Sequence, residues 1–198
     1  RMYRTMEFEQ LRATCLACHK CRLCQTRTNV VFGMGNPNAE VMLIGEGPGK
    51  TEDETGLPFV GRSGQLLDQY LKAVHLDREK NIFITNIVKC RPPENRDPLP
   101  DEWDACMPYL REQFRLMRPK IILCLGRITA QRLIRPDFSV TKEHGHWELK
   151  NGTWFTATLH PAALLRNPSQ KPTAFEDFVA LREKIYEVCD HTYPEQMK

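Results

Sequence analysis

Four cysteines close to the N-terminus form the densest group of reactive side chains in the sequence. They stand at three-residue intervals in the stretch C-L-A-C-H-K-C-R-L-C, at Cys15, Cys18, Cys21 and Cys24. In a reducing compartment, repeated Cys-x-x-Cys spacing is typical of metal ligands rather than of disulfides. The spacing therefore predicts a metal centre. It leaves zinc and an iron–sulfur cluster open, because both can take four thiolates.

Two further cysteines flank a proline-rich loop in the middle of the chain. Cys90 follows an apolar run that we expect to be a strand, and Cys106 lies within the helix expected after the loop. A metal centre that joined these two cysteines to the N-terminal group would connect segments that are distant in sequence. We interpret the remaining two cysteines, Cys124 and Cys189, as structural thiols.

The second group of candidate residues is the glycine- and acid-rich stretch 45–67, which follows an apolar run at 41–44. Open α/β sheets bind ligands at the carboxyl ends of their strands, where this stretch is expected to lie. Its Gly-Lys-Thr at 49–51 resembles part of a phosphate-binding P-loop. However, three residues rather than four separate Gly45 from Gly49, and we expect no helix in the Gly- and Pro-containing segment that follows. We therefore reject a nucleotide triphosphatase.

Two other expected strands end in polar side chains. The run at 82–88 contains Asn86, and the run at 153–159 is followed by His160. Together with Glu46 and Phe59, these residues would bring a carboxylate, an aromatic ring, an amide and an imidazole to one edge of the sheet. Such a convergence indicates a binding site.

The pattern of apolar runs predicts the elements that position these residues. Strands alternate with helices, which implies a mostly parallel sheet covered by helices on both faces, in a single domain over residues 1–198. The segment at 33–38 is expected to be a loop, and Asn151-Gly152 is typical of a hairpin turn. Strands are expected at 41–44, 82–88, 121–125, 146–149 and 153–159, and helices at 6–13, 65–76, 101–117, 126–134 and 174–188.

Length and charge set outer limits on the class of protein. The net charge of +3 over 198 residues does not by itself indicate a nucleic-acid partner, although it allows a local basic face. No apolar run approaches the roughly 20 residues of a membrane span, and the first residues lack the apolar core of a signal peptide. We therefore expect a cytoplasmic monomer that does not bind a membrane.

Several long motifs, in order over roughly residues 14 to 185, resemble the family-four uracil-DNA glycosylases, which are iron–sulfur enzymes of base excision repair. The matching stretches are V-F-G-x-G-N-P at 31–37, G-E-G-P-G-x-x-E-D-x-x-G-x-P-F-V-G at 45–61, T-N-I-V-K-C-R-P-P-x-N-R at 85–96 and H-P-A-A-L-L-R-N-P at 160–168. The resemblance implies a three-layer α/β/α sandwich around a four-stranded, mainly parallel sheet. It also implies an enzyme that flips uracil out of DNA and hydrolyses its N-glycosidic bond.

The resemblance further implies a [4Fe–4S] cluster that joins the N-terminal segment 15–24 to the loop 90–106. Its four thiolates would come from Cys18, Cys21, Cys90 and Cys106. Cys15 and Cys24 depart from the pattern of the family, so they stay open as alternative ligands.

Carried onto this chain, the motifs of the family assign a role to each residue of the predicted site. Phe59 would stack on uracil, Asn86 would pair with its N3–H and O4, and His160 would stabilise the leaving base. Glu46 would position or activate the attacking water, and Glu52 and Asp53 would either assist that water or be solvated loop acids. Gly45 and Gly47 would allow the backbone to approach the base.

DNA contacts are expected from the segment after His160 and from a basic face. Leu164, Leu165 and Arg166 would form a wedge that fills the place of the flipped base, and the basic face would comprise Arg91, Arg96, Arg62 and Lys89. The proline-rich loop contains no histidine, so we expect turnover without a covalent DNA adduct. The rival interpretation is a non-catalytic iron–sulfur DNA-binding module, which would bind DNA without releasing a base.

Overall fold

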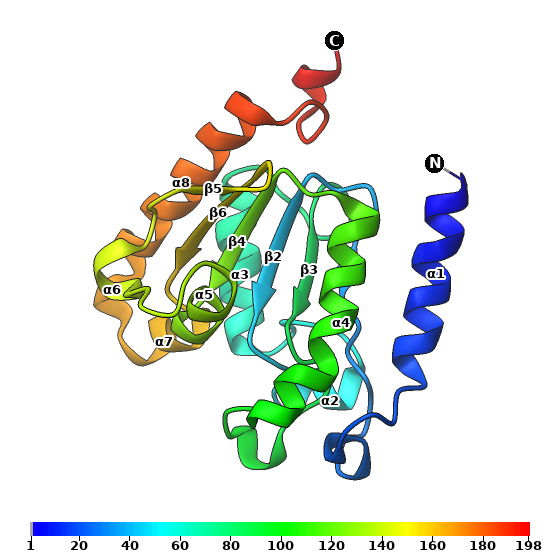
Figure 1. Cartoon of the computed structure of the whole chain (residues 1–198). Coiled ribbons are helices and arrows are strands. Elements are labelled where there is room, and N and C mark those ends of the chain that lie inside the picture. Colours follow the sequence, from blue (N-terminus) through cyan, green and yellow to red (C-terminus); the bar gives the residue numbers. More distant parts are fainter. Residues whose placement is uncertain (1) are drawn as a thin grey trace.

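One mixed sheet forms the centre of the computed structural model, which describes residues 2–198, with side chains from Thr5 onward (Figure 1). The strand order is β1-β3-β2-β4-β6-β5. The strands are β1 (Met34–Gly35), β2 (Val41–Gly45), β3 (Phe83–Asn86), β4 (Ile121–Leu125), β5 (Glu148–Lys150) and β6 (Thr153–Thr158). The α-helices are α1 (Met2–Leu16), α2 (Lys50–Thr55), α3 (Arg62–Ala73), α4 (Pro100–Met117), α5 (Arg127–Leu133), α6 (Val140–Glu143), α7 (Pro161–Arg166) and α8 (Lys171–Val188).

The four central strands, β3, β2, β4 and β6, are parallel, which confirms the predicted four-stranded parallel core. Two short antiparallel edge strands, β1 and β5, enlarge the sheet to six strands. The strand β1 lies in the segment expected to be a loop. Gly35 makes this pairing possible, because a Cβ there would overlap the carbonyl oxygen of Ile82. Only contact with β3 gives this glycine-rich segment its extended structure.

Alternate residues of the central strands face opposite helical layers, as the twofold periodicity of a strand requires. Met42 and Ile44 of β2 belong to the core cluster that contains residues of α1, α4 and α5. Val41 and Leu43 belong to the cluster that contains residues of α3 and α8. The helices therefore cover both faces, which confirms the three-layer arrangement (Figure 1).

Local signals account for several element boundaries. The hairpin between β5 and β6 turns at Asn151 and Gly152, whose φ angles are 50° and 83°, as the predicted Asn-Gly turn requires. Helix α4 begins at Pro100, and the backbone N–H of Leu99 donates to the carboxylate of Glu102 at 2.9 Å. Proline in the first turn and an acidic cap are both favoured at helix N-termini.

The prediction that no helix follows the glycine loop is wrong. Helix α2 occupies Lys50–Thr55 and ends at Gly56, whose φ of 76° terminates it after six residues. The glycine that argued against a helix therefore serves as its C-terminal cap. The case against a P-loop consequently depends on the glycine spacing alone. No helix within the described part of the chain is long and apolar enough to span a bilayer.

Candidate active site

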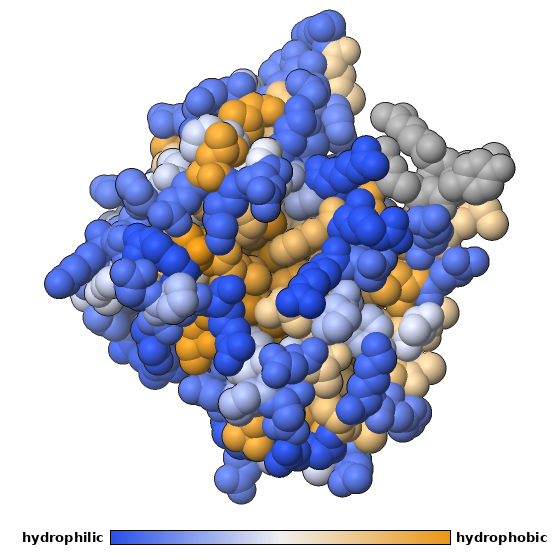
Figure 2. All heavy atoms as spheres, viewed as in Figure 1, coloured by the Kyte–Doolittle hydropathy of each residue, from blue (hydrophilic) through white to orange (hydrophobic). Residues whose placement is uncertain are grey.

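The residues predicted to bind uracil, except Gly45, line one cleft of about 830 Å³ at the carboxyl edge of the parallel strands. It is bounded by the loop after β2, the end of β3, the segment after β6 and the N-terminal end of α5. Figure 2 shows apolar residues at the centre of this view of the molecule, with hydrophilic residues around them. Glu46, Gly47, Phe59, Asn86 and His160 all belong to the lining of the cleft.

Asn86 is the last residue of β3 and is 2% exposed. Its side-chain oxygen has no hydrogen-bond partner among the described residues. A buried acceptor without a donor is costly, so this atom is suited to receive an N–H group from a ligand. Gly45 pairs with Asn86 across the sheet, and a Cβ there would lie 2.5 Å from the Asn86 oxygen. Glycine at position 45 therefore keeps the amide accessible.

The ring of Phe59 lies beside the same amide. A Cβ on Gly45 would overlap Phe59 Cζ, so the ring packs directly against the end of β2. The centroid of the ring is 5.7 Å from that of the His160 imidazole, at an interplanar angle of 36°. The cleft therefore brings together an aromatic face, an amide and an imidazole, as the sequence predicted.

His160 is held in one tautomer by the start of α7. Its Nδ1 accepts a hydrogen bond of 3.0 Å from the backbone N–H of Ala162. The proton of the neutral ring must then be on Nε2, which becomes a donor. Burial, assisted by the charge of Arg166, lowers the pKa of His160 to about 4. The imidazole is therefore a neutral donor at pH 7.

Glu46 is half-buried at the entrance to the cleft. Burial, followed by a side-chain hydrogen bond and charge repulsion from Asp97, raises the pKa of Glu46 to about 7, while Arg127 opposes the shift. Two carboxyl groups in hydrogen-bond contact share a proton more readily than they carry two charges. Glu46 can therefore exchange a proton close to neutral pH.

Glu52 and Asp53 are not the solvated loop acids of one sequence interpretation. Both carboxylates accept backbone N–H groups and thereby connect α2 to neighbouring loops. With its oxygens occupied in this way, Glu52 holds the backbone of the cleft that it also lines, whereas Asp53 holds the neighbouring segment at residues 28–29. The donors are Gly49, Val60 and Gly61 for Glu52, and Thr28 and Asn29 for Asp53.

The expected wedge is divided between the core and the cleft. Leu164 is 1% exposed and packs with Leu66 and Ala174, so the expectation that it contacts DNA is wrong for this conformation. Leu165 and Arg166 line the cleft. One turn of helix α7 directs these adjacent leucines to different sides, which the sequence alone does not reveal.

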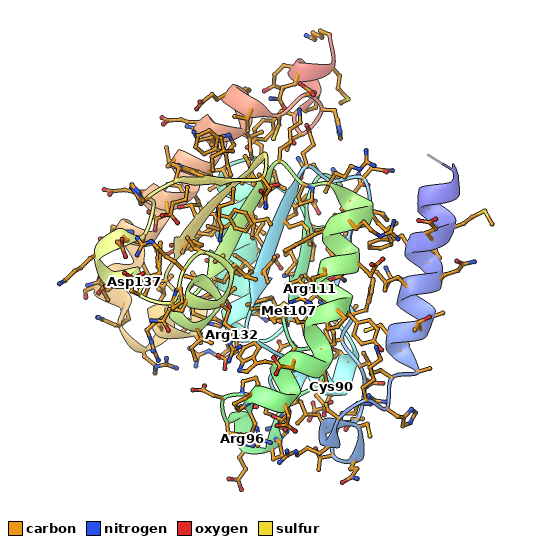
Figure 3. All side chains as sticks on the ribbon, in the orientation of Figure 1. Cys90, Arg96, Met107, Arg111, Arg132 and Asp137 are labelled. Atoms are coloured by element: carbon orange, nitrogen blue, oxygen red, sulfur yellow. The ribbon has the colours of Figure 1, made fainter. Side chains whose placement is uncertain are left out.

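The expected basic face also changes. Lys89 is 1% exposed and donates three hydrogen bonds to buried acceptors, so its placement on a DNA face is wrong. Arg96, at the start of α4 in Figure 3, is committed to both carboxylate oxygens of Glu102 at 2.7 and 2.9 Å. Arg91 is half-buried and donates to Asn95 at 2.8 Å.

Exposed Arg62 and Arg127 line the cleft. Sequence reasoning missed Arg127. Arg127 directly follows Gly126 at the carboxyl end of the predicted strand 121–125, and this position could have indicated that it lies at the cleft.

Six of the eight cysteines line a second, small cavity on the other side of the loop after β3. They are the four N-terminal cysteines together with Cys90 and Cys106. In Figure 3, Cys90 lies beside α4, on the side of the N-terminal segment. Cys124 and Cys189 are buried elsewhere, as expected for structural thiols. Within residues 2–198, no three Cys, His, Asp or Glu side chains converge on a point that could hold a single metal ion.

Donors surround the sulfur atoms of this cavity. Arg27 Nη1 donates to Cys90 Sγ at 3.4 Å, and the backbone N–H of Lys89 donates to Cys106 Sγ at 3.2 Å. Hydrogen bonds and positive charge stabilise thiolate ligands. The donor set and its surroundings therefore fit a group bound by thiolates.

Comparison with known proteins defines the class first. A family model described as the uracil DNA glycosylase superfamily matches residues 32–182, which is more than half of the chain. The match includes every residue that lines the cleft, but it leaves out the four N-terminal cysteines, which precede residue 32.

Individual relatives narrow the class. The type-4 uracil-DNA glycosylase of Sulfurisphaera tokodaii is 45% identical over 184 residues, which cover 88% of this chain and 83% of that protein. The type-4 enzyme of Archaeoglobus fulgidus is 41% identical over 189 residues, covering 90% and 92% of the two chains. A type-5 uracil-DNA glycosylase of Pyrobaculum aerophilum is 30% identical over 66% of this chain. The chain therefore belongs to the type-4 uracil-DNA glycosylases, which confirms the family resemblance.

Proposed function

We propose that this DNA-repair glycosylase holds a flipped uracil in the cleft between Glu46, Phe59, Asn86 and His160 while it hydrolyses the N-glycosidic bond. The observation that carries this assignment is the unpartnered side-chain oxygen of Asn86, buried beside an aromatic ring and a neutral imidazole. A base has to leave the duplex stack to reach such a pocket. The family membership and this geometry do not favour the rival non-catalytic module.

Asn86 gives the pocket its preference for uracil. Its oxygen accepts the N3–H of uracil and its amide nitrogen donates to O4. Cytosine presents an acceptor at N3 and a donor at N4. Its N3 would face the acceptor oxygen of Asn86, and its N4 amino group would face the donor nitrogen. Phe59 stacks on the face of the base, and the absence of side chains at Gly45 and Gly47 lets the backbone approach it.

His160 acts on the departing base. As the glycosidic bond breaks, negative charge develops on uracil, and the Nε2–H of the neutral imidazole donates to O2. One preorganised donor of this kind contributes on the order of 3 kcal/mol to the transition state. The imidazole needs no protonation to do this, which agrees with its low pKa.

Glu46 acts on the sugar side. In its ionised form the carboxylate accepts a hydrogen bond from the attacking water and stabilises the positive charge that develops on the sugar. Its location at the entrance to the cleft, with Arg127 nearby, supports this role. Hydrolysis then yields an abasic site and free uracil. No histidine in the loop 91–98 is present to form a covalent adduct.

DNA contacts are assigned to the rim of the cleft. Leu165 is the proposed wedge, and Arg166, Arg91, Arg62 and Arg127 are the proposed phosphate contacts. Apolar wedges and arginines at the duplex are common where a base step is opened. We propose that the chain acts as a monomer with a single domain, and sedimentation of the purified protein measures its oligomeric state.

The cysteine cavity is proposed to hold a [4Fe–4S] cluster through Cys18, Cys21, Cys90 and Cys106. The lining by six cysteines, with hydrogen-bond donors at Cys90 and Cys106, supports this proposal. Cys15 and Cys24 remain alternative ligands. The cluster would staple the N-terminal segment to the loop that follows Asn86.

The test is an oligonucleotide that contains one uracil, incubated with the purified protein and then treated with alkali. Strand breakage at the uracil is expected, with free uracil in the supernatant. Intact strands in the presence of the complete cluster would overturn the proposed function. If the protein bound the DNA without breaking it, the result would favour the non-catalytic DNA-binding module.

A further inference from the structure

Phe59 adopts a backbone conformation that requires explanation. Its φ is +50°, in the left-handed region that a bulky aromatic residue rarely occupies. Such a conformation persists only when the surrounding structure holds it in place. The contacts of Phe59 therefore show what keeps its ring at the uracil site.

The first contact is a buried arginine from the turn between α3 and β3. Arg78 is 8% exposed, and its Nη1 and Nη2 donate to the carbonyl oxygens of Pro58 and Phe59 at 2.6 and 2.8 Å. Asp68 of α3 accepts from Nε and Nη2 of the same guanidinium at 3.0 and 2.9 Å. The charge of the guanidinium is therefore compensated by Asp68, and its hydrogen bonds fix the orientation of the Pro58 and Phe59 carbonyl groups.

The second contact acts on the residues that follow Phe59. Glu52 Oε2 accepts the backbone N–H groups of Val60 and Gly61 at 3.0 and 3.1 Å. Gly64 of α3 lies so close that a Cβ there would overlap the Phe59 carbonyl group. The turn is therefore held by Arg78 on one side and by Glu52 on the other, with helix α3 packed against it.

We infer that Arg78 is a positioning residue of the uracil site, which holds the Phe59 turn in the conformation that presents the ring to the base. This inference rests on the proposed role of Phe59 in stacking. A guanidinium suits the task, because its planar donors can reach two carbonyls and a carboxylate at once. Fixing the turn before binding removes an ordering cost from the affinity for the base.

The first test compares Arg78→Met and Arg78→Lys with the wild-type enzyme. We expect Arg78→Met to raise both KM for uracil-containing DNA and the inhibition constant of free uracil by tenfold or more, with a smaller change in kcat. Arg78→Lys should recover part of the loss, since one ammonium can still reach a carbonyl. The Kd for the same DNA without uracil should stay unchanged.

Arg115→Met is the control, because Arg115 is an exposed residue of α4 that pairs with Glu112 and Glu7 and is not among the residues that line the cleft. It should leave the uracil inhibition constant unchanged.

The second test asks whether Arg78 acts through Phe59. Phe59→Leu should itself weaken inhibition by uracil, and Arg78→Met should add less than twofold in that background. A wild-type inhibition constant in folded Arg78→Met, or the same loss in both backgrounds, would overturn the inference.

Should Arg78→Met fail to fold, as judged by circular dichroism, Asp68→Asn replaces it in both backgrounds with a smaller expected effect of the same pattern. Wild-type enzyme that releases no uracil would instead refute the proposed function, so the two failures are distinguishable.

Discussion

The base cleft and the cysteine cavity both border the loop after β3, but they differ in the groups that line them. In the cleft, a backbone N–H fixes the imidazole of His160, and the buried side-chain oxygens of Asn86 and Thr129 have no hydrogen-bond partner among the described residues. In the cysteine cavity, thiols come from segments far apart in sequence, and burial raises the pKa of Cys15 to about 12 and that of Cys106 to about 11. The cleft is organised by protein groups alone, whereas the thiols of the proposed cluster site would have to exchange protons for metal.

Lys89 connects the two regions. Its backbone N–H donates to Cys106 Sγ, and its ammonium donates to the carbonyl oxygen of Asn86 at 2.6 Å. It also donates to Thr85 and Gln113. Because Asn86, the proposed contact to the base, and Cys106 share this lysine, loss of the proposed cluster should affect the cleft.

The largest expected effect comes from breaking the cysteine cavity. Cys90→Ser should lose the iron, which is expected at about four atoms per chain in the wild type. The Tm should fall by ~10 °C or more, because structural metal binding contributes several kcal/mol to folding. Iron analysis and calorimetry measure both. Cys24→Ser is the matched control. If Cys24→Ser lost iron and Cys90→Ser kept it, Cys24 would replace Cys90 among the proposed ligands.

The next effect is confined to the cleft. Asn86→Ala should lower uracil release about 100- to 1000-fold, since the amide supplies both polar contacts to the base. Iron content should remain at the wild-type level. Single-turnover assays measure the loss, and Asn38→Ala, on an exposed loop, is the control. An Asn86→Ala enzyme that also loses iron would show that the two regions are not separable.

A smaller effect concerns the protonation of Glu46. With a pKa of about 7, the carboxyl is protonated below neutrality, so activity should fall as pH drops through that value. Asp97→Asn removes a like charge and therefore should lower the pKa of Glu46, which moves the acidic limb of the profile to lower pH. His160, with a pKa of about 4, should not contribute to this limb. Profiles of kcat/KM against pH measure this shift. An acidic limb that is unchanged in Asp97→Asn would show that Asp97 does not raise the pKa of Glu46.

The smallest expected effect separates the adjacent leucines of α7. Leu165→Ala should reduce activity a few-fold on double-stranded DNA and less on single-stranded DNA, where no vacated place in a stack needs filling. Leu164→Ala should instead lower stability by about 2–5 kcal/mol as a core truncation. Denaturation and assays on both substrates distinguish the two, and a reversed pattern would place Leu164 in the wedge.

The features that could be predicted from sequence depend on short-range chemistry. The Asn151-Gly152 turn needs two positive φ angles, and the apolar strand 121–125 matches β4 at both ends. The glycines at 45 and 47 and the Cys-x-x-Cys spacing indicated where a ligand and a metal group could bind. Each of these signals lies within a few residues of the feature it specifies.

Other features could not be read from sequence, because they depend on partners that are distant in the chain. Sequence reasoning interpreted Glu52 as a solvated loop acid or a helper of the water and Lys89 as a surface cation, and it did not single out Arg78. Glu52 instead holds the Phe59 turn, Lys89 is enclosed beside Gln113, and Arg78 reaches Phe59 from 19 residues away. Exposed and buried polar residues look alike in a sequence, whereas their hydrogen-bond partners are known only after folding.

The sequence by itself determined the family, the parallel core and the residue types at the strand ends, because periodicity and motif spacing are properties of the chain. Only the tertiary structure decided which leucine faces the cleft, which acid lies beside Asp97, and how the Phe59 ring is held. Burial and the pairing of charges arise from packing between distant segments, so these choices are made by the fold and not by any single motif.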